Sequence, residues 1–434
     1  MRFRSTADPT VRVDLRTAVL HALPAPDALY VPERIDPLPP EFWREASRLP
    51  FPALALRLAR ALLGDELGER VLQRIVEDAF DFEVPLVPLS GRLHVLELFH
   101  GPTLAFKDFA ARFMARLMAV LAPAGGDALH VLVATSGDTG SAVAHGFRGV
   151  PGIRVHVLYP AGRVSRIQEA QLTTIGDNVA ALEVDGTFDD CQRLVKAALL
   201  DPDLGRRLRL ASANSVNVAR LVPQSFYYAW ARSRLGPDAS VVFAVPSGNL
   251  GNLTAGLFAQ RLGMPVRAFV AAQNVNDTLV RYLATGRVEP RETAATLSNA
   301  MDVSRPSNLA RIVDLYGADA ARARADVHGF RFDDEQTRAA MREVSTRYGY
   351  LVDPHGAVAY LGLESFRAQV ERDVVGVFLA TAHPAKFPEL VERETGRRVE
   401  LPPELREALA RPKQARRLAA DFGALREYLL DLCG

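Results

Sequence analysis

One lysine of this chain stands in surroundings where a charged side chain is costly. Lys107 lies between Phe106 and Asp108 in the stretch LELFHGPTLAFKDFAARFMA, with Leu104 and Phe109 close by. Burial disfavours the charged form of a lysine and lowers its pKa. A lysine made neutral in this way can attack an aldehyde and form a Schiff base. The alternative is an ordinary lysine that reaches water or pairs with Asp108.

Two glycine-rich segments of the same form follow apolar stretches and precede helical ones. SGDTG spans residues 136–140 and SGNLG spans residues 247–251, and both read S-G-[DN]-x-G. Glycines let the backbone approach an anion closely, and the first turn of a helix supplies free N–H donors. Pyridoxal phosphate carries both an aldehyde and a phosphate, which Lys107 and SGNLG together would suit. The alternative is a pair of tight strand-to-helix turns without a ligand.

Other chemistry has little support in this sequence. The motifs GxxxxGK[ST], GxGxxG, HExxH and GxSxG are absent, and the nine histidines lack metal-ligand spacing, so we expect no metal. A formal net charge of +1 over 434 residues gives no general attraction to nucleic acid or to a membrane surface. The chain shows no signal-peptide pattern and no membrane-length apolar run. With only two distant cysteines, we expect a cytoplasmic enzyme.

Apolar segments that alternate with helical ones predict an α/β architecture with parallel sheets. We expect strands at residues 128–135, 153–160, 240–246, 266–272 and 374–381, and a helix after each glycine turn. In such sheets ligands bind beyond the carboxyl ends of the strands. Apolar residues at helical spacing predict an N-terminal helical domain over residues 1–88. The catalytic region then covers residues 89–434, with a helical tail from about residue 400.

Seven segments together resemble the threonine synthase family, in its longer bacterial and fungal branch. They are HGPTLAFKDFAARFM, ATSGDTGSAVAH, SANSVNVARL, VPSGNLGNLTAGL, NVNDT, TLSNAMDVSRPSN and TAHPAKF. The resemblance implies the fold type II, tryptophan-synthase-β-like architecture, in which two α/β lobes hold pyridoxal 5'-phosphate between them. It also implies a carbon–oxygen lyase that converts O-phospho-L-homoserine and water to L-threonine and phosphate, by γ-elimination and β-addition of water.

The resemblance assigns the cofactor to one group of residues. Lys107 matches the Schiff-base lysine, whose freed amine then moves protons at Cα and Cβ of the substrate. The implied cofactor-binding set is Lys107, Asp138, Ser247, Gly248, Asn249, Leu250, Gly251 and Thr381. Thr381 matches the residue that faces the pyridine nitrogen, unless it is only a β-branched strand end. Asp138 stands where the shorter branch has an amide beside the cofactor's ring oxygen, and a carboxylate there repels a phenolate unless one of them keeps a proton.

The resemblance assigns the substrate to a second group. This set is Thr135, Ser136, Thr139, Asn214, Ser215, Asn217 and Arg220. Thr135 and Ser136 match the receptor for the substrate carboxylate. The segment NSVNVAR matches the receptor for the phosphate ester, which a guanidinium can grip with two hydrogen bonds. Asn217 is alternatively a turn or cap residue.

Two other functions stay in view at this point. One is a pyridoxal-phosphate-dependent serine or threonine dehydratase, whose substrate would not need the receptor NSVNVAR. The other is a catalytically silent homologue that binds a phospho-ligand. Asp353–Pro354 reads as a helix cap followed by a proline at the first helical position. We expect His355 and His383 to be structural.

Overall fold

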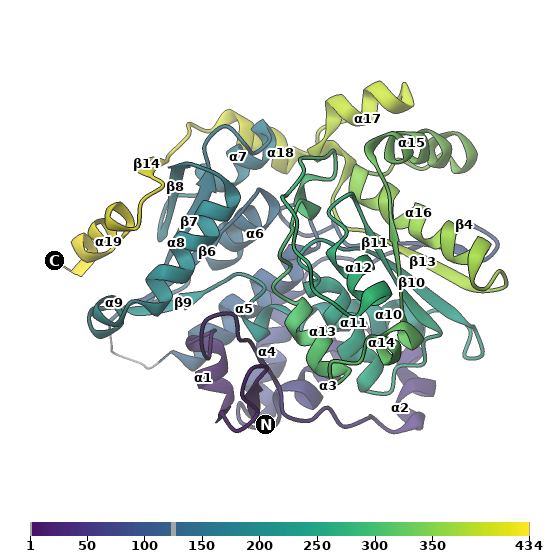
Figure 1. The fold of residues 1–434 in the computed structure, drawn as a ribbon, viewed down its shortest axis with the longest axis horizontal. Helices are drawn as coiled ribbons and strands as arrows, with labels where there is room; N and C mark the ends of the chain where they lie inside the picture. Colours follow the sequence, from purple (N-terminus) through teal and green to yellow (C-terminus); the bar gives the residue numbers. More distant parts are fainter. Residues whose placement is uncertain (1, 123–126, 434) are drawn as a thin grey trace.

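A computed structural model describes residues 2–122 and 127–433 of the protein. Two lobes, each built around a sheet, lie side by side, and the N-terminal region lies below both of them in Figure 1. The expected α/β class with parallel-sheet lobes is confirmed. No helix within the described ranges is long and apolar enough to cross a membrane.

The smaller lobe contains a sheet of five parallel strands in the order β14-β8-β7-β6-β9. Its strands are β6 (Leu129–Ala134), β7 (Ile153–Pro160), β8 (Val179–Asp185), β9 (Arg209–Ser212) and β14 (Arg416–Ala419). Its helices are α6 (Asp138–Phe147), α7 (Arg166–Thr173), α8 (Phe188–Leu200), α9 (Pro202–Arg207) and α19 (Phe422–Leu430). The end of the chain therefore returns to this lobe, where β14 pairs with β8 and α19 packs on α8. The expected helical tail thus contains a strand that the sequence pattern did not predict.

The larger lobe contains a six-stranded sheet in the order β12-β11-β10-β13-β5-β4, parallel except for β4. Its strands are β4 (Leu86–Ser90), β5 (Leu93–Glu97), β10 (Val241–Pro246), β11 (Ala268–Gln273), β12 (Val327–Arg331) and β13 (Val375–Ala380). Its helices are α10 (Gln224–Ser233), α11 (Gly251–Arg261), α12 (Thr278–Thr285), α13 (Leu309–Leu315), α14 (Ala320–Asp326), α15 (Asp334–Tyr348), α16 (Pro354–Gln369) and α17 (Pro388–Thr395). Helix α5 (Lys107–Leu121) packs against α6, and α18 (Pro403–Ala410) packs against α7.

The N-terminal region has the expected helices and, in addition, a small sheet. The helices are α1 (Leu15–Leu20), α2 (Pro40–Glu45), α3 (Phe51–Leu63) and α4 (Glu69–Ala79). The antiparallel sheet β2-β1-β3 is made of β1 (Phe3–Ser5), β2 (Arg12–Val13) and β3 (Tyr30–Pro32). Strands of two or three residues are too short to produce a recognisable alternation, so the prediction of a helical region was incomplete.

The N-terminal region shares its core with the catalytic region. The ring of Phe51 lies 5.9 Å from that of Phe109 in α5 and 5.6 Å from that of Trp230 in α10, measured between centroids. Phe80, at the end of α4, lies 6.0 Å from Phe226. These side chains belong to or pack against one continuous hydrophobic cluster. The N-terminal region is thus bound to both lobes by apolar packing.

All five predicted strands are present, with ends within two residues of those expected. The segments with candidate chemistry follow the carboxyl ends of strands: SGDTG after β6, the NSVNVAR segment after β9, SGNLG after β10 and TAHPAKF after β13. Parallel strands of one sheet present these ends at the same edge. The fold therefore gathers loops from both sheets at one place between the lobes.

Candidate active site

Lys107 is the first residue of α5, and the loop before it determines its position. Leu104 adopts a left-handed backbone with φ of 58°, and the N–H of Phe106 donates to the carbonyl of Thr381 at 2.9 Å. Asp108 does not pair with Lys107. Its carboxylate accepts the N–H and the hydroxyl of Thr103 at 2.9 and 2.7 Å. The lysine is therefore held beside the end of β13 with its amine free.

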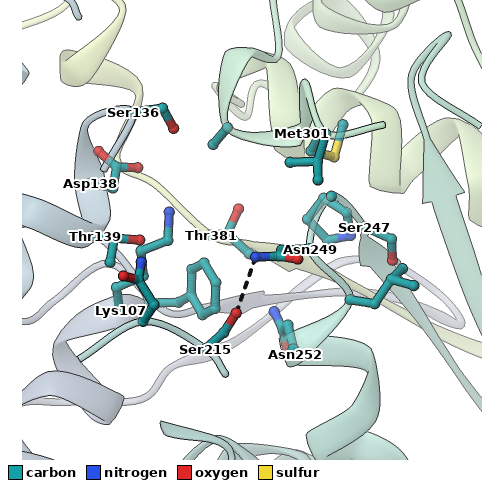
Figure 2. A pocket seen from close by; sticks show the side chains of 18 of the residues that line it. Lys107, Ser136, Asp138, Thr139, Ser215, Ser247, Asn249, Asn252, Met301 and Thr381 are labelled. Carbon is teal, nitrogen blue, oxygen red and sulfur yellow. Dashed lines mark hydrogen bonds between the residues drawn. The ribbon is translucent and has the colours of Figure 1, made fainter. Parts of the chain in front are cut away.

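The amine of Lys107 points into the pocket between the lobes (Figure 2). Within the described residues it has no hydrogen bond and no salt bridge. Desolvation lowers the pKa of Lys107 to about 8; the charge of Asp138 opposes this shift, while Arg220 and Lys386 add to it. A lysine with this pKa is neutral often enough to act as a nucleophile. The alternative of an ordinary lysine at the surface does not fit this environment.

The loop of residues 247–251 offers backbone donors to the same pocket. The N–H groups of Gly248, Asn249 and Leu250 donate to no acceptor among the residues that the structure describes. Leu250 is left-handed, with φ of 61°, and α11 begins at the next residue. Ser247 is anchored to β11 because its N–H donates to the carbonyl of Ala272 at 2.8 Å. Free N–H groups at a helix start are suited to a phosphate dianion.

Thr381 supplies a neutral hydroxyl between these two features. It follows β13, is 5% exposed and lines the pocket, and its hydroxyl has no partner within the described chain. Figure 2 shows it between Lys107 and Asn249. An amine for an aldehyde, N–H groups for a phosphate and a hydroxyl for a ring nitrogen lie in one pocket. This donor set fits pyridoxal phosphate.

A buried lysine, Lys386, which the sequence interpretation missed, forms a salt bridge with Asp138. The Nζ of Lys386 lies 2.7 Å from Oδ1 of Asp138 and donates to the carbonyl of Thr103 at 2.9 Å. The amide of Gln168 also donates to Oδ1 of Asp138, at 3.0 Å. The side chain of Lys386 is fully buried. Its signal was a lysine among small and aromatic residues in TAHPAKF, the same type of environment that drew attention to Lys107.

Lys386 explains how a carboxylate can occupy this position. Burial alone would raise the pKa of Asp138. The charges of Lys386 and Lys107, together with hydrogen bonds from Lys386 and Gln168, outweigh burial and hold the pKa of Asp138 below its ordinary value. Asp138 is therefore ionised, with its negative charge balanced from behind by Lys386. The local charge is closer to that of a neutral amide than the sequence alone indicated.

Three residues that were predicted to bind the substrate have side chains that already form hydrogen bonds with the backbone of the protein. The hydroxyl of Thr135 donates to the carbonyl of Gly137 and accepts two N–H groups of the turn. The amide of Asn214 makes two hydrogen bonds with the backbone of Ala134. Asn217 donates to the carbonyls of Val19 and Ser212 and accepts the N–H of Ala219. Thr135 and Asn214 still line the pocket, whereas Asn217 does not, and its geometry is that of the alternative cap.

The other predicted substrate residues keep free donors. The hydroxyls of Ser136 and Thr139 have no partner among the described residues, and both line the pocket. The hydroxyl of Ser215 accepts the amides of Asn249 and Asn308, at 3.2 and 3.0 Å, so its own hydrogen remains available. Figure 2 shows the Ser215–Asn249 contact.

Arg220 is the buried cation of this group. It is 2% exposed, its Nη1 donates to the carbonyl of Ala213 at 2.5 Å, and its Nε has no partner. Desolvation lowers the pKa of Arg220 to about 10, against the attraction of Asp108, so the guanidinium stays charged at neutral pH. A buried guanidinium that lines a pocket and donates a single hydrogen bond within the described residues is suited to receive an anion.

The two histidines noted in the sequence have structural contacts. His355 accepts the N–H of Ala300 on Nε2 at 3.2 Å, so Nδ1 carries the proton and donates to Asp353 at 2.6 Å. Asp353 caps α16, and Pro354 is the first residue of that helix, as expected. His383 accepts the N–H of Ala385.

Comparison with known proteins agrees with this geometry. Residues 84–381 match the model of the pyridoxal-phosphate dependent enzyme family, residues 2–80 match threonine synthase N terminus, and residues 356–429 match threonine synthase, C-terminal. Threonine synthase of Escherichia coli is 42% identical over 99% of this chain and 100% of its own. The chain belongs to the threonine synthase family. The threonine synthase of Serratia marcescens is 45% identical to this chain over 88% of each chain.

Solved threonine synthases have the same fold. The crystal structure from Escherichia coli superposes with a TM-score of 0.93 over all of both chains, at 42% identity. A threonine synthase from Brucella melitensis, solved with pyridoxal phosphate bound, gives 0.91 at 35% identity over 99% of this chain and 98% of its own. Maize serine racemase, at 15% identity and a TM-score of 0.55, shares the fold alone. The chain is thus a fold type II, pyridoxal-phosphate-dependent lyase, as expected.

The pKa of Lys107 predicts how cofactor attachment depends on pH. Only the neutral amine attacks an aldehyde, so attachment of pyridoxal phosphate to cofactor-free protein should accelerate up to pH about 8 and then level off. An ordinary lysine would continue to accelerate to about pH 10. The measurement is the rate of covalent attachment, trapped with borohydride, across this range. Lys107→Ala is the control and should show no trapped cofactor; a rate that rises through pH 10 would refute the lowered pKa.

Gly248 is predicted to be needed for the shape of the SGNLG loop. A Cβ at this position would lie 2.7 Å from Cα of Met301 and 2.8 Å from the carbonyl oxygen of Ala300, so the crowding falls on that neighbouring loop. Overpacking of this kind costs about 1–3 kcal/mol. Gly248→Ala should therefore weaken binding of pyridoxal phosphate in a titration of cofactor-free protein. Gly205→Ala, where a Cβ meets nothing within 4 Å, is the control; equal affinities in both variants would place the phosphate elsewhere, with SGDTG as the next candidate.

The Asp138–Lys386 pair is predicted to behave as one neutral unit. Lys386→Met leaves a buried carboxylate without its cation, and breaking a buried pair in this way costs about 3–5 kcal/mol. Adding Asp138→Asn removes the unpaired charge and should restore much of that loss. Urea unfolding of the two single variants and the double variant measures the coupling. Losses that simply add would show that the two residues do not depend on each other.

Proposed function

We propose that this threonine synthase acts on O-phospho-L-homoserine and water and releases L-threonine and phosphate. The observation that carries the proposal is Arg220, a buried guanidinium that lines the pocket and donates one hydrogen bond, to the carbonyl of Ala213, within the described residues. A substrate without a phosphate would leave this cation buried and unsatisfied, which is costly. A phosphate ester would supply the missing acceptors.

Two anionic groups of the substrate then need separate receptors. For the phosphate ester, the proposed donors are the guanidinium of Arg220 and the hydroxyls of Ser215 and Thr139. For the carboxylate, the proposed donor is the hydroxyl of Ser136, beside the turn that Thr135 stabilises. Asn214 acts indirectly, because its two hydrogen bonds with Ala134 hold the loop of residues 213–220, here called the substrate loop, against the end of β6.

In the proposed reaction, Lys107 first holds the cofactor and then carries protons. Bound pyridoxal phosphate supplies an electron sink for charge that develops at the substrate's α-carbon. With the cofactor bound, Lys107 would remove and return protons at Cα and Cβ of the substrate; its lowered pKa suits both directions of transfer. Arg220 stabilises the phosphate as it leaves from Cγ, and water is added at Cβ. Asp138, balanced by Lys386, and Thr381 orient the cofactor ring.

A serine or threonine dehydratase is the competing activity. Such an enzyme shares the cofactor chemistry, and its substrate has no phosphate. The guanidinium of Arg220, with one hydrogen bond within the described residues, and the free hydroxyls of Ser136 and Thr139 favour a larger, doubly anionic substrate. The distinction therefore depends on the response of Arg220 variants to the two kinds of substrate.

Arg220→Ala is predicted to impair the reaction of the phosphorylated substrate selectively. A hydrogen bond to a charged group contributes about 1.5–3 kcal/mol, and about 1.4 kcal/mol corresponds to a factor of ten. The kcat/KM for O-phospho-L-homoserine should fall by roughly 10- to 100-fold or more. The slow side reaction with serine or threonine should change much less. An equal fall for both substrate types would make Arg220 a structural residue, and a wild-type preference for serine or threonine would favour the dehydratase.

A further inference from the structure

Among the described residues, Arg311 in α13 is one of the largest side chains that are fully buried, and it has no carboxylate partner there. It donates instead to four neutral acceptors. They are the carbonyls of Tyr30, Ser215 and Val216, at 3.0, 2.8 and 2.6 Å, and Oδ1 of Asn308, at 2.5 Å. Burial lowers the pKa of Arg311 to about 9, which still leaves it charged at neutral pH. A charge buried against neutral groups is a costly arrangement, so its geometric effect is the informative feature.

Two of these acceptors belong to the loop that carries the substrate donors. The carbonyls of Ser215 and Val216 are both drawn to one planar guanidinium, which fixes the orientation of that peptide. The orientation of this peptide determines where the hydroxyl of Ser215 points and where the segment that leads to Arg220 begins. Arg311 therefore determines how the substrate loop, residues 213–220, faces the pocket.

The contact with Asn308 extends the same network to the cofactor loop. The amide of Asn308 accepts from Arg311 on its oxygen and donates from its nitrogen to the hydroxyl of Ser215 at 3.0 Å and to the carbonyl of Asn249 at 2.9 Å. Asn249 in turn donates to the hydroxyl of Ser215. The two anion-binding loops are thus held in register by Arg311 and Asn308.

The fourth acceptor connects this network to the N-terminal region. Tyr30 lies in β3, and its carbonyl is the partner of Nε of Arg311. The substrate loop makes a second contact with the same region, because Asn217 donates to the carbonyl of Val19 at 2.8 Å. A bidentate salt bridge between Arg4 and Asp314, at 2.6 and 2.8 Å, fastens β1 to α13 nearby. The N-terminal region therefore contacts the substrate loop directly, through Val19 and Asn217, and indirectly, through Tyr30 and Arg311.

We propose that Arg311 is a positioning residue that holds the phosphate-binding donors of residues 213–220 in place, using the N-terminal region as its anchor. This inference rests on the proposed function, since it concerns the receptor for the substrate's phosphate. It also gives the N-terminal region a defined part in the reaction. A donor misplaced by about 1 Å can cost on the order of 100-fold in rate.

Binding of inorganic phosphate by the cofactor-loaded enzyme, measured by calorimetry, tests the inference directly. Arg311→Lys keeps the charge, but an ammonium cannot hold four acceptors in the plane of a guanidinium. We expect the Kd for phosphate to rise about tenfold or more, and the KM for O-phospho-L-homoserine to rise more than kcat falls. Asn308→Ala, a milder change in the same network, should shift both quantities in the same direction and keeps the test valid if Arg311→Lys folds poorly.

Arg232→Lys is a matched control for the loss of a buried arginine. Arg232 is 5% exposed and donates to the carbonyls of Pro265, Gly236 and Pro237, none of which lines the pocket. It should reduce stability without changing the phosphate Kd. Equal phosphate affinities in the Arg311, Asn308 and Arg232 variants would overturn the inference. Arg220→Ala distinguishes failure of this inference from failure of the proposed function. Unchanged phosphate affinity in that variant would overturn the proposed phosphate receptor itself.

Discussion

Positive charge that the protein itself leaves incompletely paired, in the pocket and behind it, is the constraint on which this site depends. Lys107 has no hydrogen bond or salt bridge within the described chain, Arg220 has an unpaired Nε, and Arg311 is surrounded by neutral acceptors. Of these cations and Lys386, only Lys386 has a described carboxylate at hydrogen-bond distance. A buried charge without compensation is unfavourable, and anions that enter the pocket compensate it. Ligands that bind only the folded protein also stabilise it, so the occupied enzyme is expected to be the more stable form.

The two buried carboxylates at this site are treated differently. Asp138 faces the pocket and is kept ionised by Lys386 and Lys107. Asp108 lies one residue after Lys107 but is directed to Thr103, and burial raises its pKa to about 6 against those hydrogen bonds. If Asp108 paired with Lys107, that lysine would remain protonated. Asp108 is bonded to Thr103 and Asp138 is paired with Lys386, so neither carboxylate forms a salt bridge with Lys107 and its amine stays available as a nucleophile.

The sequence was most informative where a pattern has one physical cause. Long apolar segments predicted the central strands of both sheets, because a strand covered on both faces must be apolar throughout. Lys107 and SGNLG were found because a cation among aromatic residues and a glycine turn before a helix are rare combinations. The strands β1, β2, β3, β9 and β14 were missed because two to four residues cannot show a period. The longer strands β4, β5, β8 and β12 were also not predicted.

Contacts between distant residues were out of reach of the sequence. Lys386 pairs with a residue about 250 positions away, and no local pattern indicates that distance. Thr135 and Asn214 have the right chemistry for a ligand, and nothing in the sequence showed that the backbone already uses their side chains. For Asn217 the sequence offered both a ligand role and a cap, and the structure has the cap. Arg311 was invisible for the same reason, since all its acceptors except Asn308 are backbone carbonyls far along the chain.

The return of the C-terminal segment to the smaller lobe has a consequence for synthesis of the protein. A ribosome delivers β8 (Val179–Asp185) more than two hundred residues before β14 (Arg416–Ala419), the strand that pairs with its outer edge. Throughout that interval β8 is an open edge with unpaired backbone groups, which is the part of a sheet most prone to pair with another chain. The smaller lobe can complete its sheet only after residues 416–419 have been made, so shorter nascent chains expose the seven-residue edge of β8 in place of the four-residue strand β14 that forms this edge of the complete sheet.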